Sequence, residues 1–299
     1  MTSLQSGARI NFKNVLFLTD FSEPSSEALP FAMAIARGYG SKVYAAHVIL
    51  PSTFAYMTPE AAGALLDEEE EAAKVEIGRV DAQLTGLQRE ILLERGSNLW
   101  EVVSRLLKER EIDLIVLGTH GRTGLKKALL GSAAEEVFRR SRVPVLMSGP
   151  DARADTHSGG RFRRVLFATD FNDVSSLAAP YAVSLAQENQ AQLILLHVLP
   201  QPKPGKVAIS EGLSVAEAAH QLEDLVPEEA RQWCLPRAVV EHGDPAPRIL
   251  AAAKGCGADL IVLGVRGMDR LANVATRTQK HIAYEVVAHA RCPVLTVRG

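Results

Sequence analysis

The chain repeats its own sequence in four ordered places, and this internal repeat limits its fold more than any other feature. The segment NVLFLTDFS at residues 14–22 returns as RVLFATDFN at 164–172. Three more pairs follow in the same order: AHV at 46–48 with LHV at 196–198, DLIVLG at 113–118 with the same letters at 259–264, and VPVL at 143–146 with CPVL at 292–295. The spacing between partners is nearly constant. We therefore predict two copies of one domain, at residues 1–150 and 161–299.

Each copy alternates short apolar runs with amphipathic segments of helical length. In the first copy the expected strands are 15–19, 42–49, 90–94, 113–117 and 143–147, and the expected helices are 25–39, a long acidic helix from Pro59, 99–110 and 133–140. Strands that alternate with helices indicate a parallel sheet covered on both faces, with right-handed crossovers. The expected fold class is α/β, with a Rossmann-like, five-stranded parallel sheet in each copy. A ligand crevice is expected at the carboxyl ends of the strands, where the strand order reverses.

The second copy departs from the first in its middle. Residues 201–205 read QPKPG, which predicts an extended spacer, and a helix is expected over Glu211–Leu225 with a break at Pro227. The segment that joins the copies, residues 150–160, is polar and rich in glycine, as is typical of a linker.

Composition excludes several classes of protein. A formal net charge of −2 argues against a general nucleic-acid binder, and no apolar run approaches the roughly 20 residues of a membrane span. The first ten residues lack the apolar core of a signal peptide, so a cytoplasmic location is expected. The three cysteines, Cys234, Cys256 and Cys292, have no metal-ligand spacing and are expected to be reduced structural thiols.

The stretch from Asp113 to Ser132, DLIVLGTHGRTGLKKALLGS, has the pattern of a phosphate site. A buried strand stops at a glycine, a glycine-punctuated loop follows, and a helix begins near Ser132. Glycines let backbone N–H groups approach an anion, and a helix start adds unpaired donors and a favourable dipole. Ser132 is expected to be the helix N-cap, with Glu135 at the capping-box spacing. The glycine spacing is neither the Walker A pattern nor the dinucleotide fingerprint.

The spacing Gly118-x2-Gly121-x9-Gly131-Ser132 is that of the ATP-binding pattern in the universal stress protein family, which both copies resemble along their whole length. The resemblance implies an adenine nucleotide alpha hydrolase-like fold. It also implies that the two copies form an intrachain pseudo-dimer, with the strands around Val145 and Val294 meeting at a pseudo-twofold axis.

The resemblance further implies which residues bind ATP, together with Mg²⁺. Asp20 and the backbone of Val48 would hold adenine. The ribose and phosphates would contact Gly118, Gly121, Gly131, Ser132 and the amide of Ala133. Among the basic residues of the loop, Arg122 is preferred over Lys126 and Lys127 to meet a phosphate, and His120 is either a phosphate contact or an exposed loop residue.

The second copy keeps only part of this pattern. Asp170, Val198, Gly264 and Gly267 are present, but after nine intervening residues the chain has Arg277-Thr278 in place of Gly-Ser. A side chain at that glycine is expected to obstruct the approach of phosphate. The alternative is that the arginine adds a charge to a phosphate from another direction. We expect a functional ATP site in the first copy and an impaired or altered one in the second.

Several polar residues have simpler explanations. His47 and His197 follow strand cores and are expected to serve packing and local hydrogen bonds. Asp113 and Asp259 precede buried strands and are expected to cap or turn the end of the preceding helix. His281 and His289 are too far apart on one helix for a two-ligand metal pair.

Three hypotheses of function follow. The first is an ATP-binding regulator of the stress response with weak ATPase activity at most, because no catalytic triad, paired-carboxylate site or kinase motif is recognisable. The second is a protein-interaction or signalling module that holds no nucleotide. The third is a related adenylyl transferase, against which the lack of a HxGH motif counts. Expected partners are an adenine nucleotide, a second copy of the tandem chain and a regulatory protein, with no nucleic acid and no membrane.

Overall fold

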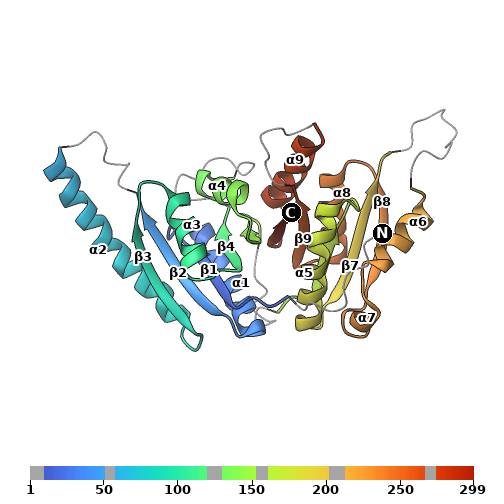
Figure 1. The fold of residues 1–299 in the computed structure, drawn as a ribbon, viewed down its shortest axis with the longest axis horizontal. Coiled ribbons are helices and arrows are strands. Elements are labelled where there is room, and N and C mark those ends of the chain that lie inside the picture. Colours follow the sequence, from blue (N-terminus) through green and yellow to red (C-terminus); the bar gives the residue numbers. More distant parts are fainter. Residues whose placement is uncertain (1–9, 51–57, 120–129, 153–160, 202–212, 267–273) are drawn as a thin grey trace. The chain divides into compact units, whose positions relative to one another are not determined.

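The computed structural model describes residues 10–50, 58–119, 130–152, 161–201, 213–266 and 274–299. These residues divide into two compact units (Figure 1). The first unit covers Phe12–Pro150, and the second covers Asp151–Gly299 together with Ile10 and Asn11.

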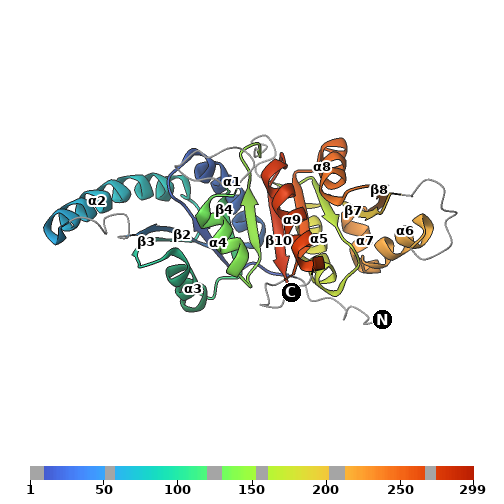
Figure 2. The ribbon, with the colours of Figure 1, turned by 90° about the horizontal axis from the view of Figure 1, so that it is seen from above.

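The first unit is a parallel sheet with the strand order β3-β2-β1-β4-β5. Its strands are β1 (Asn14–Leu18), β2 (Lys42–Ile49), β3 (Arg89–Arg95), β4 (Leu114–Gly118) and β5 (Val145–Ser148). Its helices are α1 (Glu23–Tyr39), α2 (Pro59–Gln83), α3 (Leu99–Glu109) and α4 (Ser132–Arg140). Figure 2 shows α1 and α2 on one side of the sheet and α3 and α4 on the other. The order reverses between β1 and β4, which places the expected crevice there.

The second unit repeats this arrangement with the order β10-β9-β6-β7-β8. Its strands are β6 (Arg164–Ala168), β7 (Gln192–Leu199), β8 (Arg237–His242), β9 (Leu260–Val265) and β10 (Val294–Arg298). Its helices are α5 (Asp173–Asn189), α6 (Val215–Asp224), α7 (Glu228–Cys234), α8 (Pro245–Cys256) and α9 (Val274–His289). The predicted α/β class with a five-stranded parallel sheet in each copy is confirmed.

The middle of the second unit differs from the sequence prediction. The helix expected over Glu211–Leu225 begins only at Val215, because Ser214 and Glu217 form a capping box there. A separate helix, α7, then begins after Pro227, its N-cap residue, where the sequence predicted a break. Two short helices thus stand where the first unit has the long helix α2.

The central strands form the core because they are apolar along nearly their whole length. Val15, Leu16 and Phe17 of β1 are fully buried, and so are Val165, Leu166 and Phe167 of β6. A strand buried on both faces is what a parallel sheet between two helix layers requires.

Asp113 and Asp259 anchor the starts of the central strands. The carboxylate of Asp113 accepts hydrogen bonds from the backbone N–H of Lys13 at 2.7 Å and of Asn14 at 3.3 Å. Asp259 does the same for Arg163 at 2.7 Å and Arg164 at 3.1 Å. The prediction that these residues cap or turn the preceding helix is therefore wrong: each carboxylate holds the chain that enters the neighbouring strand. Burial raises the pKa of both carboxyl groups.

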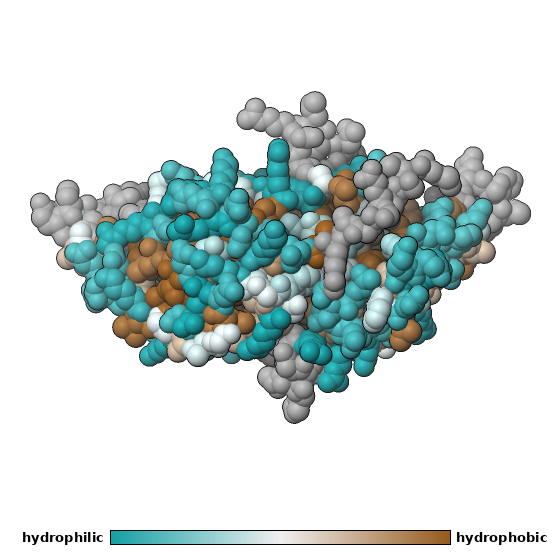
Figure 3. All heavy atoms as spheres, turned by 60° about the horizontal axis from the view of Figure 1, so that its bottom comes forward, coloured by the Kyte–Doolittle hydropathy of each residue, from teal (hydrophilic) through white to brown (hydrophobic). Residues whose placement is uncertain are grey.

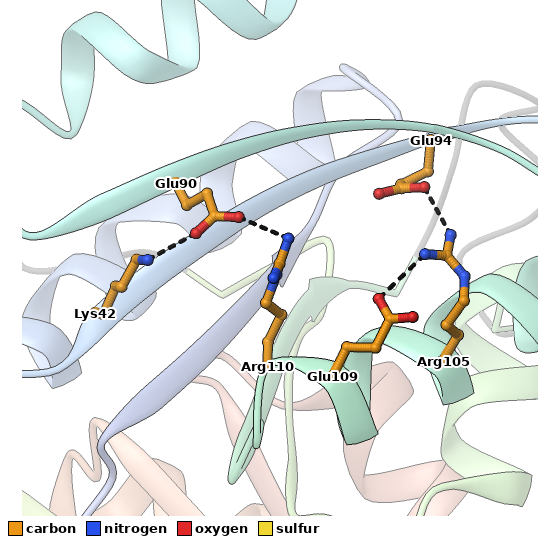
Figure 4. A network of polar contacts seen from close by, with 6 residues as sticks. All are labelled: Lys42, Glu90, Glu94, Arg105, Glu109 and Arg110. Carbon is orange, nitrogen blue, oxygen red and sulfur yellow. Dashed lines mark hydrogen bonds and ion pairs between the residues drawn. The ribbon is translucent and has the colours of Figure 1, made fainter.

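Ion pairs cover the outermost strand of the first sheet, β3. On one face Glu90 contacts Lys42 at 2.7 Å and Arg110 at 2.9 Å, as drawn in Figure 4. Figure 4 also shows Arg105, which bridges Glu94 at 2.7 Å and Glu109 at 3.2 Å. The opposite face carries the pairs Arg89–Asp81 and Arg95–Glu70, which attach α2. Charged side chains along an edge strand discourage pairing with strands of other molecules.

The described surface is mainly hydrophilic on the face drawn in Figure 3, with apolar side chains gathered in patches. Within the described ranges no helix combines the length and apolar character that crossing a membrane requires.

We predict that Asp113→Ala lowers the free energy of unfolding by about 1–3 kcal/mol, because it leaves strand-entry N–H groups without their acceptor. The native pKa of Asp113 is raised, so the native state binds more protons than the unfolded state just above the ordinary aspartate pKa. The wild type should therefore lose stability as pH rises through that window, and Asp113→Ala should show a smaller loss, since Asp259, whose pKa is also raised, still contributes. Urea unfolding at several pH values measures both effects. Glu68→Ala, at an exposed site on α2, is the control, and an equal effect of the two variants would contradict the role of the carboxylate.

Candidate functional site

The site is built around the turn that follows β1. Asp20 Oδ1 accepts hydrogen bonds from Ser22 N at 3.1 Å and Ser22 Oγ at 2.6 Å. Ser22 is the N-cap of α1, and its Oγ accepts from Ser25 N. The side chain of Thr19 accepts from Phe21 N at 3.0 Å. These bonds fix the Asp20 carboxylate at the carboxyl end of the sheet, beside the helix start.

Phe21 adopts a left-handed backbone conformation, with φ at 63°. This conformation is uncommon for a bulky residue and persists only where its surroundings hold it. His47 provides the support: its ring lies against that of Phe21, with centroids 4.3 Å apart, and its Nδ1 is 2.8 Å from the carbonyl oxygen of Thr19. Because a carbonyl only accepts, Nδ1 must carry the proton. His47 thus serves packing and local hydrogen bonding, as predicted.

The second half repeats this turn almost atom for atom. Phe171 has φ at 61°, its ring lies 4.4 Å from that of His197, and His197 Nδ1 is 2.8 Å from Thr169 O. Asn172 replaces serine as the N-cap of α5 and also bonds to the carboxylate of Asp170. The prediction for His197 is also confirmed. Both halves therefore build the same wall of the crevice.

Two glycines, Gly118 at the end of β4 and Gly264 one residue before the end of β9, are needed for packing. A Cβ atom on Gly118 would lie 2.6 Å from the carbonyl oxygen of Pro24 and 2.9 Å from Ser25 N, in the first turn of α1. At Gly264 it would lie 2.4 Å from Ser175 Cα. Sequence reasoning assigned these glycines to the approach of a ligand and missed this helix contact. Their recurrence in both copies was the available signal, since only one copy keeps the full phosphate pattern.

The predicted phosphate end of the first half lies at the start of α4, where the chain comes back beside the end of β4. Gly131 N donates to Thr119 O at 2.7 Å, and Gly131 O accepts the first helical hydrogen bond of α4, from Glu135 N. Gly131 is the N-cap and no side chain caps this helix, so the prediction that Ser132 is the N-cap is wrong: Ser132 is the first residue of α4. The first N–H groups of α4 have no acceptor within the helix, which makes them donors for an anion.

Six of the eight predicted site residues lie in the described part of the chain, and they share one edge of the sheet. Asp20 follows β1, Val48 lies near the end of β2, and Gly118 ends β4. The other three residues, Gly131, Ser132 and Ala133, open α4. The remaining predicted residues, Gly121 and Arg122, lie outside the described residues, and so do His120, Lys126, Lys127 and Gly267.

The matching helix of the second half begins earlier. α4 has nine residues and α9 has sixteen, although both end at the same distance before the last strand. Counted back from that strand, Ile282 and Ala283 hold the positions of Ala133 and Ala134. Arg277, predicted to replace Gly131, instead lies inside α9. The difference between the halves thus includes the length of the helix as well as the identity of a single residue.

A pocket of about 430 Å³ lies at the carboxyl edge of the second sheet. Its lining includes Asp170, Val198, Gly264, Arg266, Ile282 and Ala283. It occupies the place in this half that the proposed ATP crevice occupies in the first.

The described residues give little support for a reactive thiol or for a metal site. All three cysteines are free, as predicted, and burial raises the pKa of Cys292 to about 12, which keeps it a thiol. No group of three His, Cys, Asp or Glu side chains within the described ranges is placed to hold a metal ion.

Comparison with known proteins gives a consistent result. The model of the universal stress protein family matches residues 11–148 and again 161–298. A universal stress protein of Methanocaldococcus jannaschii is 34% identical over 140 residues, which are 46% of this chain and 81% of that protein. One from Thermus aquaticus is 35% identical over 142 residues, covering 46% of this chain and 99% of that protein. The crystal structure of a universal stress protein from Archaeoglobus fulgidus covers 95% of this chain and 98% of its own, with a TM-score of 0.71 and 21% identity, a likeness of fold.

We predict that Gly118→Ala destabilises the chain by about 1–3 kcal/mol, because the new methyl group meets backbone atoms of α1 that cannot move aside easily. Gly38→Ala is the matched control. Gly38 lies within α1 with nothing near its would-be Cβ, so alanine there should be neutral or slightly stabilising. Urea unfolding of the two variants checks the prediction, and equal stabilities would show that Gly118 is not required for packing.

Proposed function

Since the chain belongs to the universal stress protein family, we propose that its first half binds ATP and that the protein is a nucleotide-responsive regulator of the stress response. Asp20 and the backbone of Val48 hold the adenine. Gly118, Gly121 and Gly131 line the ribose and phosphates. Arg122 contacts a phosphate, and the N–H groups of Ser132 and Ala133 bind another.

The start of α4 is the observation that carries this proposal. The residues that open it fit an anion, because Gly131 is half-buried, has no side chain and is tied to the end of β4 by its 2.7 Å hydrogen bond to Thr119. Its φ of −60° and ψ of 153° suit any amino acid, so backbone conformation does not explain the glycine. Close approach of a ligand does explain it.

The adenine end is supported by the rigidity of the turn after β1. Asp20 is held by Ser22, and Phe21 is held by His47, so the carboxylate and the end of β2 are positioned before a ligand arrives. A site that is ordered beforehand loses less entropy on binding.

Magnesium would enter with ATP, bound mainly by the phosphates and water, as is usual for this ion. When present it supplies positive charge beside the phosphates. The sequence shows no recognisable catalytic arrangement, so we propose hydrolysis that is slow at most. We further propose that the protein is cytoplasmic, that tandem chains pair with one another and that a regulatory protein reads the nucleotide state.

The test is to denature the purified protein, filter it and quantify released nucleotide by chromatography. We expect about one ATP per chain in the wild type. Gly131→Arg should lower the content, and the affinity for added Mg-ATP, at least tenfold, because the side chain fills the space of a phosphate. Gly78→Arg is the matched control, since Gly78 is exposed on α2 with nothing near its would-be Cβ.

Other outcomes would change the conclusion. Two ATP per chain would show that both halves bind it. Full binding by Gly131→Arg would remove the start of α4 from the site. No nucleotide, and no binding of added Mg-ATP, would leave the protein-interaction module as the function.

A further inference from the structure

The pocket of the second half is a formed cavity with a chemistry of its own. Its volume of about 430 Å³ lies within the usual range of small-molecule sites. Most of its lining is apolar, contributed by Leu196, Val198, Pro245, Ile249, Leu263 and Ile282. The described lining also includes the polar residues Thr169, Asn172 and Ser175 and two charged residues, Asp170 and Arg266, both of which are exposed.

One wall of this pocket has the same structure as the wall of the first half that is proposed to hold adenine. β6 and β7 pair in the same register as β1 and β2, with Ala168 opposite Leu196 where Leu18 lies opposite Ala46. The histidine bond that holds the turn has the same length, 2.8 Å, in both halves. Asp170 and Val198 therefore present the same groups to a ligand as Asp20 and Val48.

The opposite wall has lost the features that suit a polyphosphate. Ile282 and Ala283 lie in the interior of α9, well past its start at Val274. Backbone N–H groups in a helix interior are bonded to carbonyl groups of the preceding turn, so they are not available to an anion. Placing a triphosphate against this apolar wall would strip its charges of water without replacement.

Among the described residues of the lining, Arg266 is the one cationic side chain. It directly follows β9, at the rim of the pocket, where a guanidinium can form paired hydrogen bonds with one phosphate or carboxylate. The described lining thus suits a flat, largely apolar ring system beside Asp170 and one anionic group beside Arg266.

We propose that the second half binds an adenine nucleoside, bare or with a single phosphate, and excludes ATP. The chain would then carry two ligand sites of different chemistry, one for the triphosphate and one for a product or precursor with fewer phosphates. This inference rests on the proposed function, because the likeness of the adenine walls identifies the ligand class.

The experiment titrates adenosine into the full-length protein already saturated with Mg-ATP, so that the first half is occupied, and follows binding by calorimetry. We expect about one adenosine per chain. Asp170→Asn keeps the shape of the side chain but removes its charge, and it should lower the affinity for adenosine at least tenfold. The matched variant Asp20→Asn should leave the affinity for adenosine within twofold of the wild-type value and should weaken the binding of ATP. Circular dichroism verifies that both variants are folded.

A second measurement assigns the half directly. Photolabelling with 8-azidoadenosine in the presence of Mg-ATP, followed by peptide mapping, should mark residues 161–201 rather than 10–50. AMP should bind more tightly than adenosine. Arg266→Ala should lower the affinity for AMP to that for adenosine and should leave the affinity for adenosine unchanged.

The inference is overturned if adenosine does not bind the ATP-saturated chain, if Asp170→Asn has no effect, if the label marks the first half or if two ATP molecules bind per chain. Failure of the proposed function looks different: Mg-ATP would then bind neither half. Adenosine that labels residues 161–201 would in that case still support the second site.

Discussion

The hydrogen bond between a strand histidine and the carbonyl group at the end of the neighbouring strand is the constraint on which each half depends. His47 and His197 reach across to Thr19 and Thr169, and their rings hold Phe21 and Phe171 in a left-handed conformation. That conformation sends the chain directly into the next helix. Because the glycine of β4 or β9 lets the helix start pack tightly against the sheet, the turn forms one fixed wall of a crevice.

The two halves share this wall and differ across from it. In the first half a short helix begins at Ser132, just after its N-cap Gly131 beside the end of β4, and its first N–H groups have no acceptor within the helix. In the second half a longer helix runs past the corresponding place, and apolar side chains line the pocket. In our proposal, this change in where one helix begins alters which ligand fits, while the sheet, the turn and the packing glycine stay the same. Duplication permits such a change, since one copy can retain the original site.

Sequence reasoning was successful where the signal is local or repeated. The apolar runs around Val15 and Val165 predicted central strands, and the repeated histidines were correctly assigned to packing. It was wrong at Asp113, whose carboxylate accepts a hydrogen bond from the backbone just before β1, about one hundred residues earlier in the chain. It was also wrong at Ser132, which is the first residue of α4 and not its N-cap. It also missed the contact of Gly118 with α1. Two of these features are contacts between residues distant in the sequence, and the third is the position of a helix boundary. Residue type and spacing alone predict neither kind of feature.

By itself the sequence determined that the chain is a duplicated α/β domain, because four ordered repeats and the alternation of apolar runs leave few other folds. It also identified the strand ends where polar residues and glycines gather. Only the tertiary structure decided how the halves differ, since Arg277 aligns with Gly131 by counting but lies inside α9. A helix start depends on which backbone groups find acceptors and on how the segment packs. Counting residues along the chain cannot supply that information.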